Sequence, residues 1–157
     1  MYVMRKVYVL DRMEEILDKK EADNINAFMN TSYCVMSGRK VMYTLRIDEL
    51  SPELYESDKA LLTWAFITAW NPLPEILSKS ENDERNKQLE KEIGERSLKY
   101  KKGLGKADDG SWSEESYFIE NISIVEALEL GKLYGQKAIV MGERGMPAEL
   151  LVLQNRS

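Results

Sequence analysis

The sequence contains no histidine and only one cysteine, Cys34, among its 157 residues. Without histidine the chain cannot form a Ser-His-Asp or Cys-His catalytic pair, and it lacks the commonest metal ligand. One cysteine cannot form an intramolecular disulfide, and Cys34 lies in an apolar run where a buried, inert thiol is expected. We therefore expect no metal ion, no cofactor and no catalytic residues of these kinds.

Long hydrophobic runs are also absent. The chain has no stretch of 18 apolar residues, and Arg5 and Lys6 interrupt the start of the chain where a signal peptide would be apolar. We expect no transmembrane helix and no membrane association, and a cytoplasmic location. The net charge of −5 argues against broad binding to nucleic acid, which requires clustered lysine and arginine.

The remaining composition is typical of a folded globular protein. Hydrophobic residues make up 43% of the chain and charged residues 31%. A chain of this length buries one core, so we predict a single domain over residues 1–157. Within it, residues 1–31 are expected to form an N-terminal extension.

The pattern of apolar residues predicts an α+β fold with a mainly antiparallel sheet. Strands are expected at residues 3–10, 32–36, 41–47, 63–70, 98–102, 116–120, 138–141 and 149–153, and helices at 11–20, 52–62, 81–98 and 123–134. Residues 21–31 fit either helix or loop, and Gly103–Gly110 is expected to be a flexible connection. From Thr63 onward the order is β-α-β-β-α-β, as in ferredoxin-like domains, and the upstream strand, helix and hairpin would extend or cover that sheet.

Hydrogen-bonding side chains gather where the strand ending at Asn71 leads into the next helix. We call Asn71, Asn82, Arg85 and Asn86 the Asn/Arg cluster. Asn82 and Asn86 are four residues apart and share one helical face. Arg85 can hold a carboxylate or phosphate through two parallel hydrogen bonds, and the first turns of a helix favour an anion. The cluster therefore predicts a site for a small polar or phosphorylated ligand.

A purely structural interpretation of these residues is also open. Asparagine before proline is a common turn former, Asn82 would cap the helix, and Arg85 would pair with Glu115 to tie the helix to the sheet. Among the tryptophans, Trp64 is expected in the core. Trp112 follows a glycine-bearing loop and is the one expected to face a ligand.

Four short motifs occur in order along the chain. They read I-T-A-W-N-P at residues 67–72, E-N-D-E-R-N at 81–86, W-S-E-E-S at 112–116 and G-Q-K-A at 135–138. With these motifs the chain resembles the bacterial domain-of-unknown-function family numbered 3293, over residues 63–141. The resemblance implies a module and a set of positions, and no reaction.

We expect a non-catalytic module that recognises a small polar or anionic, nucleotide-like ligand. Arg85 would bind the anionic group, Glu115 would orient Arg85, and Gln136 would close one side. The full set of expected ligand-binding residues is Asn71, Asn82, Arg85, Asn86, Trp112, Glu115 and Gln136. One alternative is a protein-interaction module, an acidic inhibitor or adaptor, favoured by the net charge and the eight methionines. A second is a Mg²⁺-dependent phosphoester hydrolase that uses Glu114 or Glu115.

Overall fold

The computed structural model describes residues 7–9, 19–71 and 76–153 of the chain. Its strands are β1 (Val7–Val9), β2 (Thr31–Ser37), β3 (Lys40–Leu45), β4 (Thr63–Ile67), β5 (Tyr100–Ala107), β6 (Ser113–Glu120), β7 (Ala138–Glu143) and β8 (Glu149–Val152). Its helices are α1 (Lys19–Met29), α2 (Pro52–Ser57), α3 (Lys79–Glu95) and α4 (Ile124–Leu133). The predicted α+β class is confirmed.

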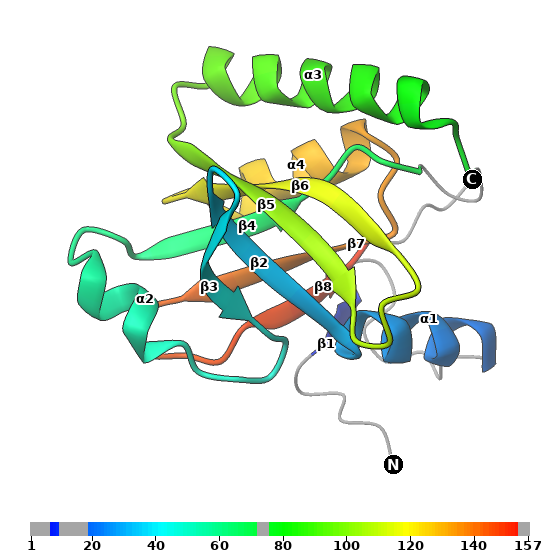
Figure 1. Cartoon of the computed structure of the whole chain (residues 1–157). Helices are drawn as coiled ribbons and strands as arrows, with labels where there is room; N and C mark the ends of the chain where they lie inside the picture. Colours follow the sequence, from blue (N-terminus) through cyan, green and yellow to red (C-terminus); the bar gives the residue numbers. More distant parts are fainter. Residues whose placement is uncertain (1–6, 10–18, 72–75, 154–157) are drawn as a thin grey trace.

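The strands form one sheet in the order β1-β8-β7-β4-β6-β5-β2-β3. Every neighbouring pair is antiparallel except β1 and β8. The sheet is strongly curled (Figure 1). Ile47, just after β3, forms a parallel bridge with Ala148, just before β8. The two ends of the strand order therefore approach each other at this point. From β4 to β7 the elements follow the predicted β-α-β-β-α-β order, and β8 follows them.

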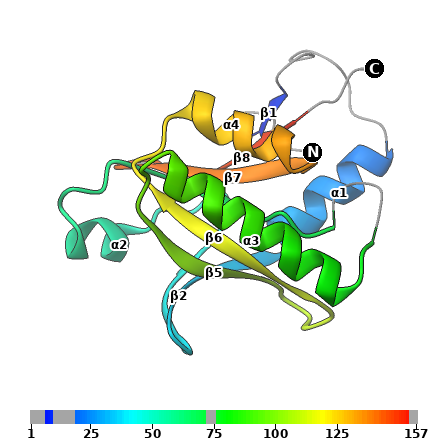
Figure 2. The ribbon, with the colours of Figure 1, turned by 90° about the horizontal axis from the view of Figure 1, so that it is seen from above.

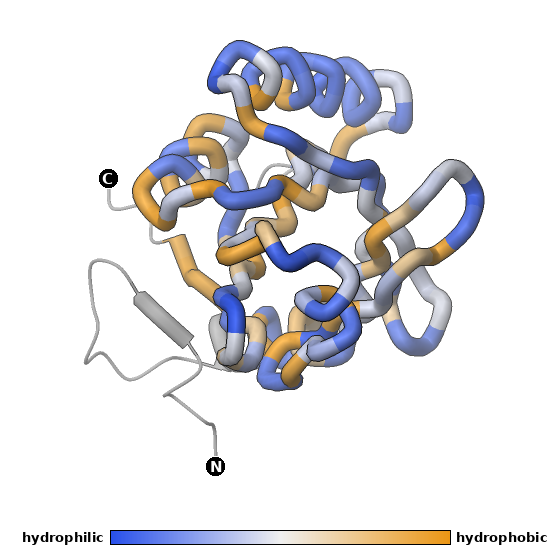
Figure 3. Tube along the Cα trace, turned by 90° about the vertical axis from the view of Figure 1, so that its left-hand side faces the viewer, coloured by the Kyte–Doolittle hydropathy of each residue, from blue (hydrophilic) through white to orange (hydrophobic). Residues whose placement is uncertain are grey.

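Helices α3 and α4 lie side by side over one face of the sheet (Figure 2). Leu89 and Ile93 of α3 are fully buried and belong to the same apolar cluster as Ala127 and Leu130 of α4. The rest of α3 is strongly hydrophilic, which is visible along the top of Figure 3. A narrow apolar stripe of this kind packs a helix on a sheet by one face and leaves the other in water.

A second apolar cluster fills the concave face of the curled sheet. It includes Trp64, Phe66 and Phe118 from the central strands, together with Ile25 of α1 and Leu54 of α2. The Trp64 indole donates a hydrogen bond of 2.9 Å to the Tyr55 hydroxyl, which satisfies this buried donor. The prediction that Trp64 lies in the core is confirmed, because only 1% of it is exposed.

Several element boundaries differ from the predicted ones. The expected strand at residues 3–10 and helix at 11–20 fall largely outside the described residues, and residues 21–29, left open by the sequence, are helical. Helix α2 ends at Ser57 because Asp58 is extended and its carboxylate accepts a hydrogen bond from the Ala60 amide. Helix α3 begins at Lys79, where Ser78 and Glu81 form a reciprocal capping box.

The structure corrects the expectation of a flexible connection at Gly103–Gly110. Gly103 and Gly105 lie inside β5, which is hydrogen-bonded to β2 on one side and to β6 on the other. Glycine is favoured at residue 103 because a Cβ atom there would lie 2.6 Å from the Phe66 ring, which would have to shift. A close approach between backbone and side chain therefore explains a glycine that composition alone suggests is a loop residue.

Candidate functional site

Successive side chains along β4 and the residues after it point alternately to the two faces of the sheet. Ala65, Ile67 and Ala69 belong to the apolar cluster under α3 and α4. Phe66, Thr68 and Trp70 line a pocket on the concave side. The run ends at Asn71, whose φ of 44° lies in the left-handed region that asparagine tolerates better than most residues.

Asn71 and Asn82 bind each other in a reciprocal pair. The Asn71 backbone N–H donates to Asn82 Oδ1 at 2.9 Å, and Asn82 Nδ2 donates to Asn71 Oδ1 at 3.0 Å. Asn71 Oδ1 also accepts from the Leu77 amide at 2.9 Å, so this side chain closes the loop between β4 and α3. Asn82 is 3% exposed and does not cap the helix, a role that belongs to Ser78.

Asn86 joins α3 to two strands. Its Oδ1 accepts from the Ala69 amide at 2.8 Å, and its Nδ2 donates to the Glu115 carbonyl at 2.9 Å. This pattern satisfies main-chain groups at the point where β4 ceases to pair regularly. Glu115 takes part through its backbone, and its side chain is exposed.

Arg85 is bound to two backbone carbonyl groups. Its Nε donates to the Ala69 oxygen at 2.7 Å and its Nη2 to the Tyr134 oxygen at 2.6 Å. Gln136 Nε2 donates to the carbonyls of Trp70 and Tyr134 at 3.1 and 3.2 Å. The guanidinium group thus ties α3 to the end of α4 and to the segment after β4.

These bonds bring the four sequence motifs into contact with one another. Asn71 and Ala69 belong to the first motif and Asn82, Arg85 and Asn86 to the second, while Glu115 and Gln136 represent the third and fourth. The expectation that the cluster is assembled in one place agrees with these contacts. Its hydrogen bonds, however, are largely used on the protein's own main chain.

A pocket of about 450 Å³ lies next to the cluster, on the concave face. We call it the aromatic hollow, because its lining includes the aromatic residues Phe28, Tyr33, Phe66, Trp70 and Trp112. Among the expected ligand-binding residues, Asn71, Trp112 and Gln136 line this hollow, and Asn82, Arg85, Asn86 and Glu115 do not. Trp112 is 42% exposed, as befits a residue at an accessible site.

Gly105 contributes to the space in the hollow. It stands opposite Glu114 in the β5–β6 register and opposite Tyr33 in the β2–β5 register. A Cβ atom at residue 105 would meet nothing closer than 3.9 Å, so the volume in front of this glycine is open. A larger side chain at this position would enter the hollow without a clash at its first atom.

Three residues that line the hollow and carry polar groups are not among the expected ligand-binding residues. Glu114 Oε2 accepts a bond of 3.2 Å from Asn71 Nδ2, and burial raises the pKa of this carboxyl above its usual range while the Asn71 bond opposes the shift. Trp70 Nε1 is buried and has no acceptor among the described residues. Lys137 also lines the hollow and makes no ion pair within the described part of the chain. Alternate residues of a strand share one face, so Glu114 lies on the same face as Ser116. This spacing is the signal in the sequence that could have indicated Glu114.

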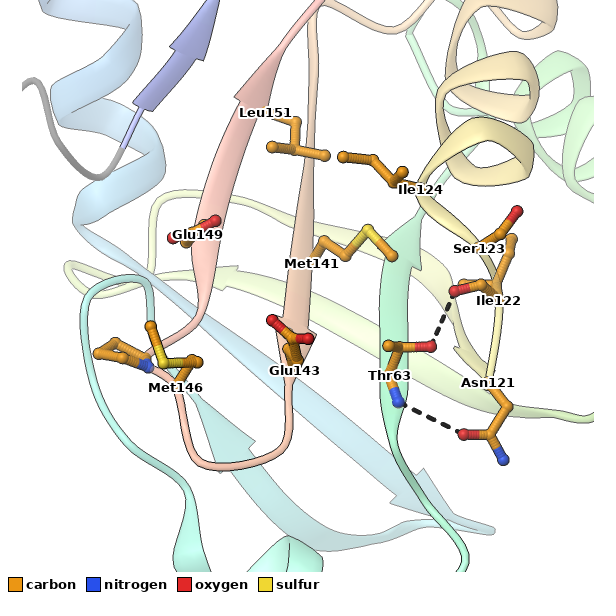
Figure 4. Close-up of a pocket in the computed structure, with 12 residues that line it drawn as sticks. Thr63, Asn121, Ile122, Ser123, Ile124, Met141, Glu143, Met146, Glu149 and Leu151 are labelled. Carbon is orange, nitrogen blue, oxygen red and sulfur yellow. Dashed lines mark hydrogen bonds between the residues drawn. The ribbon is translucent and has the colours of Figure 1, made fainter.

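A second pocket of about 480 Å³ lies beside β7, β8 and the segment before α4 (Figure 4). Ile124, Met141 and Leu151 form its apolar part, and the carboxyl groups of Glu143 and Glu149 flank it. None of the expected ligand-binding residues lines this pocket.

Among residues 7–9, 19–71 and 76–153, no group of three or more cysteine, aspartate and glutamate side chains is placed to hold a metal ion. No helix within these ranges is long and apolar enough to cross a membrane.

The fold and the site together define an α+β protein with a curled sheet, two helices on its convex face and an aromatic hollow at its concave face. Residues 67–139 match the family model described as "Protein of unknown function (DUF3293)", which confirms the resemblance drawn from the four motifs. The match covers somewhat under half of the chain and includes most of the residues that line the hollow. No curated protein and no solved structure matches the chain.

Proposed function

We propose that this protein is a non-catalytic binding module that holds a small aromatic ligand with polar or anionic groups in the aromatic hollow. One observation carries the proposal: a pocket of about 450 Å³ is lined by aromatic residues together with the polar residues Asn71, Glu114 and Lys137. Ligand pockets generally combine apolar walls with a few convergent polar groups.

The role of the Asn/Arg cluster in this proposal differs from the one predicted from the sequence. Arg85 donates to two carbonyl groups of the protein, so two of its N–H groups already have acceptors within the fold. Asn71 links the cluster to the hollow, since it contacts both Asn82 and Glu114. The cluster would therefore shape the wall of the hollow, while Lys137 would attract an anionic group on the ligand.

The proposed compartment is the cytoplasm. The only cysteine in the chain, Cys34, is a buried free thiol. A protein without disulfides suits a reducing environment.

The test of the proposal uses the full chain and the dye 8-anilinonaphthalene-1-sulfonate, which is both aromatic and anionic. We expect the dye to bind the folded protein with enhanced fluorescence and the variant Gly105→Val to weaken that binding by about tenfold or more, because valine occupies the space the ring would take. Thermal unfolding of Gly105→Val is expected to match the parent protein or to exceed it, since valine favours strands.

Gly94→Ala is the matched control, because Gly94 is exposed on α3 and a Cβ atom there would meet nothing within 4 Å. This variant should bind the dye as the parent does. Equal dye affinity in Gly105→Val and the parent, with both folded, would show that the hollow is not the binding site and would overturn the proposal.

A further inference from the structure

We infer that the ligand of the aromatic hollow is an amine, whose protonated amino group pairs with the Glu114 carboxylate while its aromatic ring lies against Trp112. This inference rests on the proposed function and specifies the charge of one polar group on its ligand. It follows from an open carboxyl oxygen, from rings on the same face of the sheet, and from the absence of a paired cation among the described residues.

One oxygen of the Glu114 carboxyl group is available to a ligand. Oε2 accepts a hydrogen bond of 3.2 Å from Asn71 Nδ2, whereas Oε1 accepts none from the described residues. Oε1 is also open to solvent, because Trp70 Nε1 is the only buried side-chain polar atom without a partner in the described part of the chain. A carboxylate oxygen can only accept hydrogen bonds, so the matching ligand group is a donor.

The Glu114 carboxyl group lies at the wall of the hollow. Alternate residues of β6 share one face, so Glu114 lies on the same face as Phe118 of the concave cluster. Burial raises the pKa of the Tyr33 hydroxyl, and the negative charge of Glu114 adds to this rise. The carboxyl group is therefore close to Tyr33 as well as to Asn71, and both of these residues line the hollow.

Three aromatic rings lie on the same face as this carboxyl group. A Cβ atom at Gly103 would meet the Phe66 ring, and a Cβ atom at Gly105, two residues further, would lie 4.0 Å from Cζ3 of the Trp112 ring. The Tyr33 ring meets the Phe66 ring edge-on, with centroids 5.3 Å apart. Aromatic faces attract cations, and tryptophan does so most strongly. Trp112 is 42% exposed, so its ring is accessible to a ligand.

No cation among the described residues neutralises Glu114. It forms no ion pair with a lysine or arginine in that part of the chain. Lys137 also lines the hollow, but it directly precedes β7, and β4 lies between β7 and β6 in the sheet. A partly buried carboxylate without a counter-charge is unfavourable. A protonated amino group supplies both the missing charge and the donor for Oε1, whereas a neutral N–H supplies only the donor.

The experiment is an NMR titration of the ¹⁵N-labelled full chain with tryptamine and with indole-3-propionate, which share one ring and carry opposite charges. At pH 8 the amino group of tryptamine is protonated, as that of lysine is. We expect tryptamine to bind at least about tenfold more tightly than indole-3-propionate. Tryptamine should also shift the Asn71 side-chain amide signal, because Asn71 Nδ2 shares the Glu114 carboxyl group with the ligand.

Two variants test the role of the charge. Glu114→Gln keeps a carbonyl oxygen to accept the Asn71 bond but removes the negative charge, so the preference for tryptamine should fall below about threefold. Glu115→Gln is the matched control, because it makes the same change in net charge at an exposed side chain that does not line the hollow. This control should retain the preference of the parent protein.

The outcomes separate this inference from the proposed function. If the dye binds and Gly105→Val blocks it, but tryptamine binds no more tightly than indole-3-propionate, the amine inference is wrong and the binding function stands. An equal preference in Glu114→Gln and Glu115→Gln would also overturn the inference, because the attraction would then come from elsewhere. If neither the dye nor tryptamine perturbs the hollow, both are wrong. Should Glu114→Gln fail to fold, the Asn71 signal and the two affinities in the parent protein decide.

Discussion

Arg85 illustrates a side chain whose role in the fold does not follow from its residue type. Arg85 has the planar, multi-donor head group suited to carboxylates and phosphates, yet it binds the carbonyl oxygens of Ala69 and Tyr134. Hydrogen bonds from a charged donor are stronger than neutral ones. Arg85 is therefore expected to stabilise the fold more than an exposed basic residue does.

Replacement of Arg85 by methionine tests this role. Two carbonyl groups lose a charged donor, so we expect the free energy of unfolding to fall by about 2–4 kcal/mol. Lys87→Met is the control, because Lys87 is exposed on the same helix, and should change stability by less than about 0.5 kcal/mol. Urea denaturation of the three proteins measures the difference.

The opposite result has a clear meaning. If Arg85→Met is as stable as Lys87→Met but no longer binds an anionic ligand, Arg85 is the anion-binding residue predicted from the sequence.

At the scale of the elements, strand β5 combines two glycines with different roles. Gly103 is next to the Phe66 ring, where a Cβ atom would come within 2.6 Å, and Gly105 faces open space. The two residues are two positions apart, so they lie on the same face of the strand. One glycine serves packing and the other leaves the hollow open.

A pair of alanine variants separates these roles. We expect Gly103→Ala to lower the free energy of unfolding by about 1–3 kcal/mol, because the Phe66 ring must move within a packed core. Gly105→Ala should be neutral or stabilise by up to about 1 kcal/mol, since alanine costs the unfolded chain less entropy than glycine. Thermal and urea denaturation of both variants checks the order, and equal effects would contradict the assigned contacts.

At the scale of the whole molecule, the curled sheet separates two apolar clusters and leaves the hollow at one end of the concave one. Burial at this end raises the pKa of Glu114 in the folded protein. The folded state therefore holds the Glu114 proton more tightly than the unfolded chain does. By linkage, Glu114 destabilises the fold increasingly as pH rises from its unfolded pKa, about 4.3, through its folded pKa.

The direction of the Glu114 pKa shift gives a prediction for the unliganded protein. Glu114→Gln cannot titrate, so its stability relative to the parent should increase as pH rises above about 4 and level off once the pH exceeds the folded pKa of Glu114. Urea denaturation of both proteins at several pH values measures the difference in their free energies of unfolding. The contributions of the other carboxylates cancel in this difference. A difference that is independent of pH, or that decreases as pH rises, would contradict the assigned burial of Glu114.

Much of the fold was predictable because local patterns decide it. The apolar run after Thr63, the Ser123 cap and the Gly135 stop predicted β4 and α4 correctly in type, although β4 ends at Ile67 and not at residue 70. The β5 glycines were misinterpreted because the reason for Gly103 is Phe66, which lies in a different strand. The extent of the single predicted domain stays a prediction, and residues 10–18 of the N-terminal extension lie outside the described residues.

By itself, the sequence determined the α+β class, the order of the elements and the family to which residues 67–139 match. It also determined that asparagine and arginine side chains would meet where β4 leads into α3. The tertiary structure alone decided which partners those side chains have and which of them reach the hollow. The reason is that residue type sets how many hydrogen bonds a group can make, whereas the acceptors of Arg85 come from segments 16 and 49 residues away.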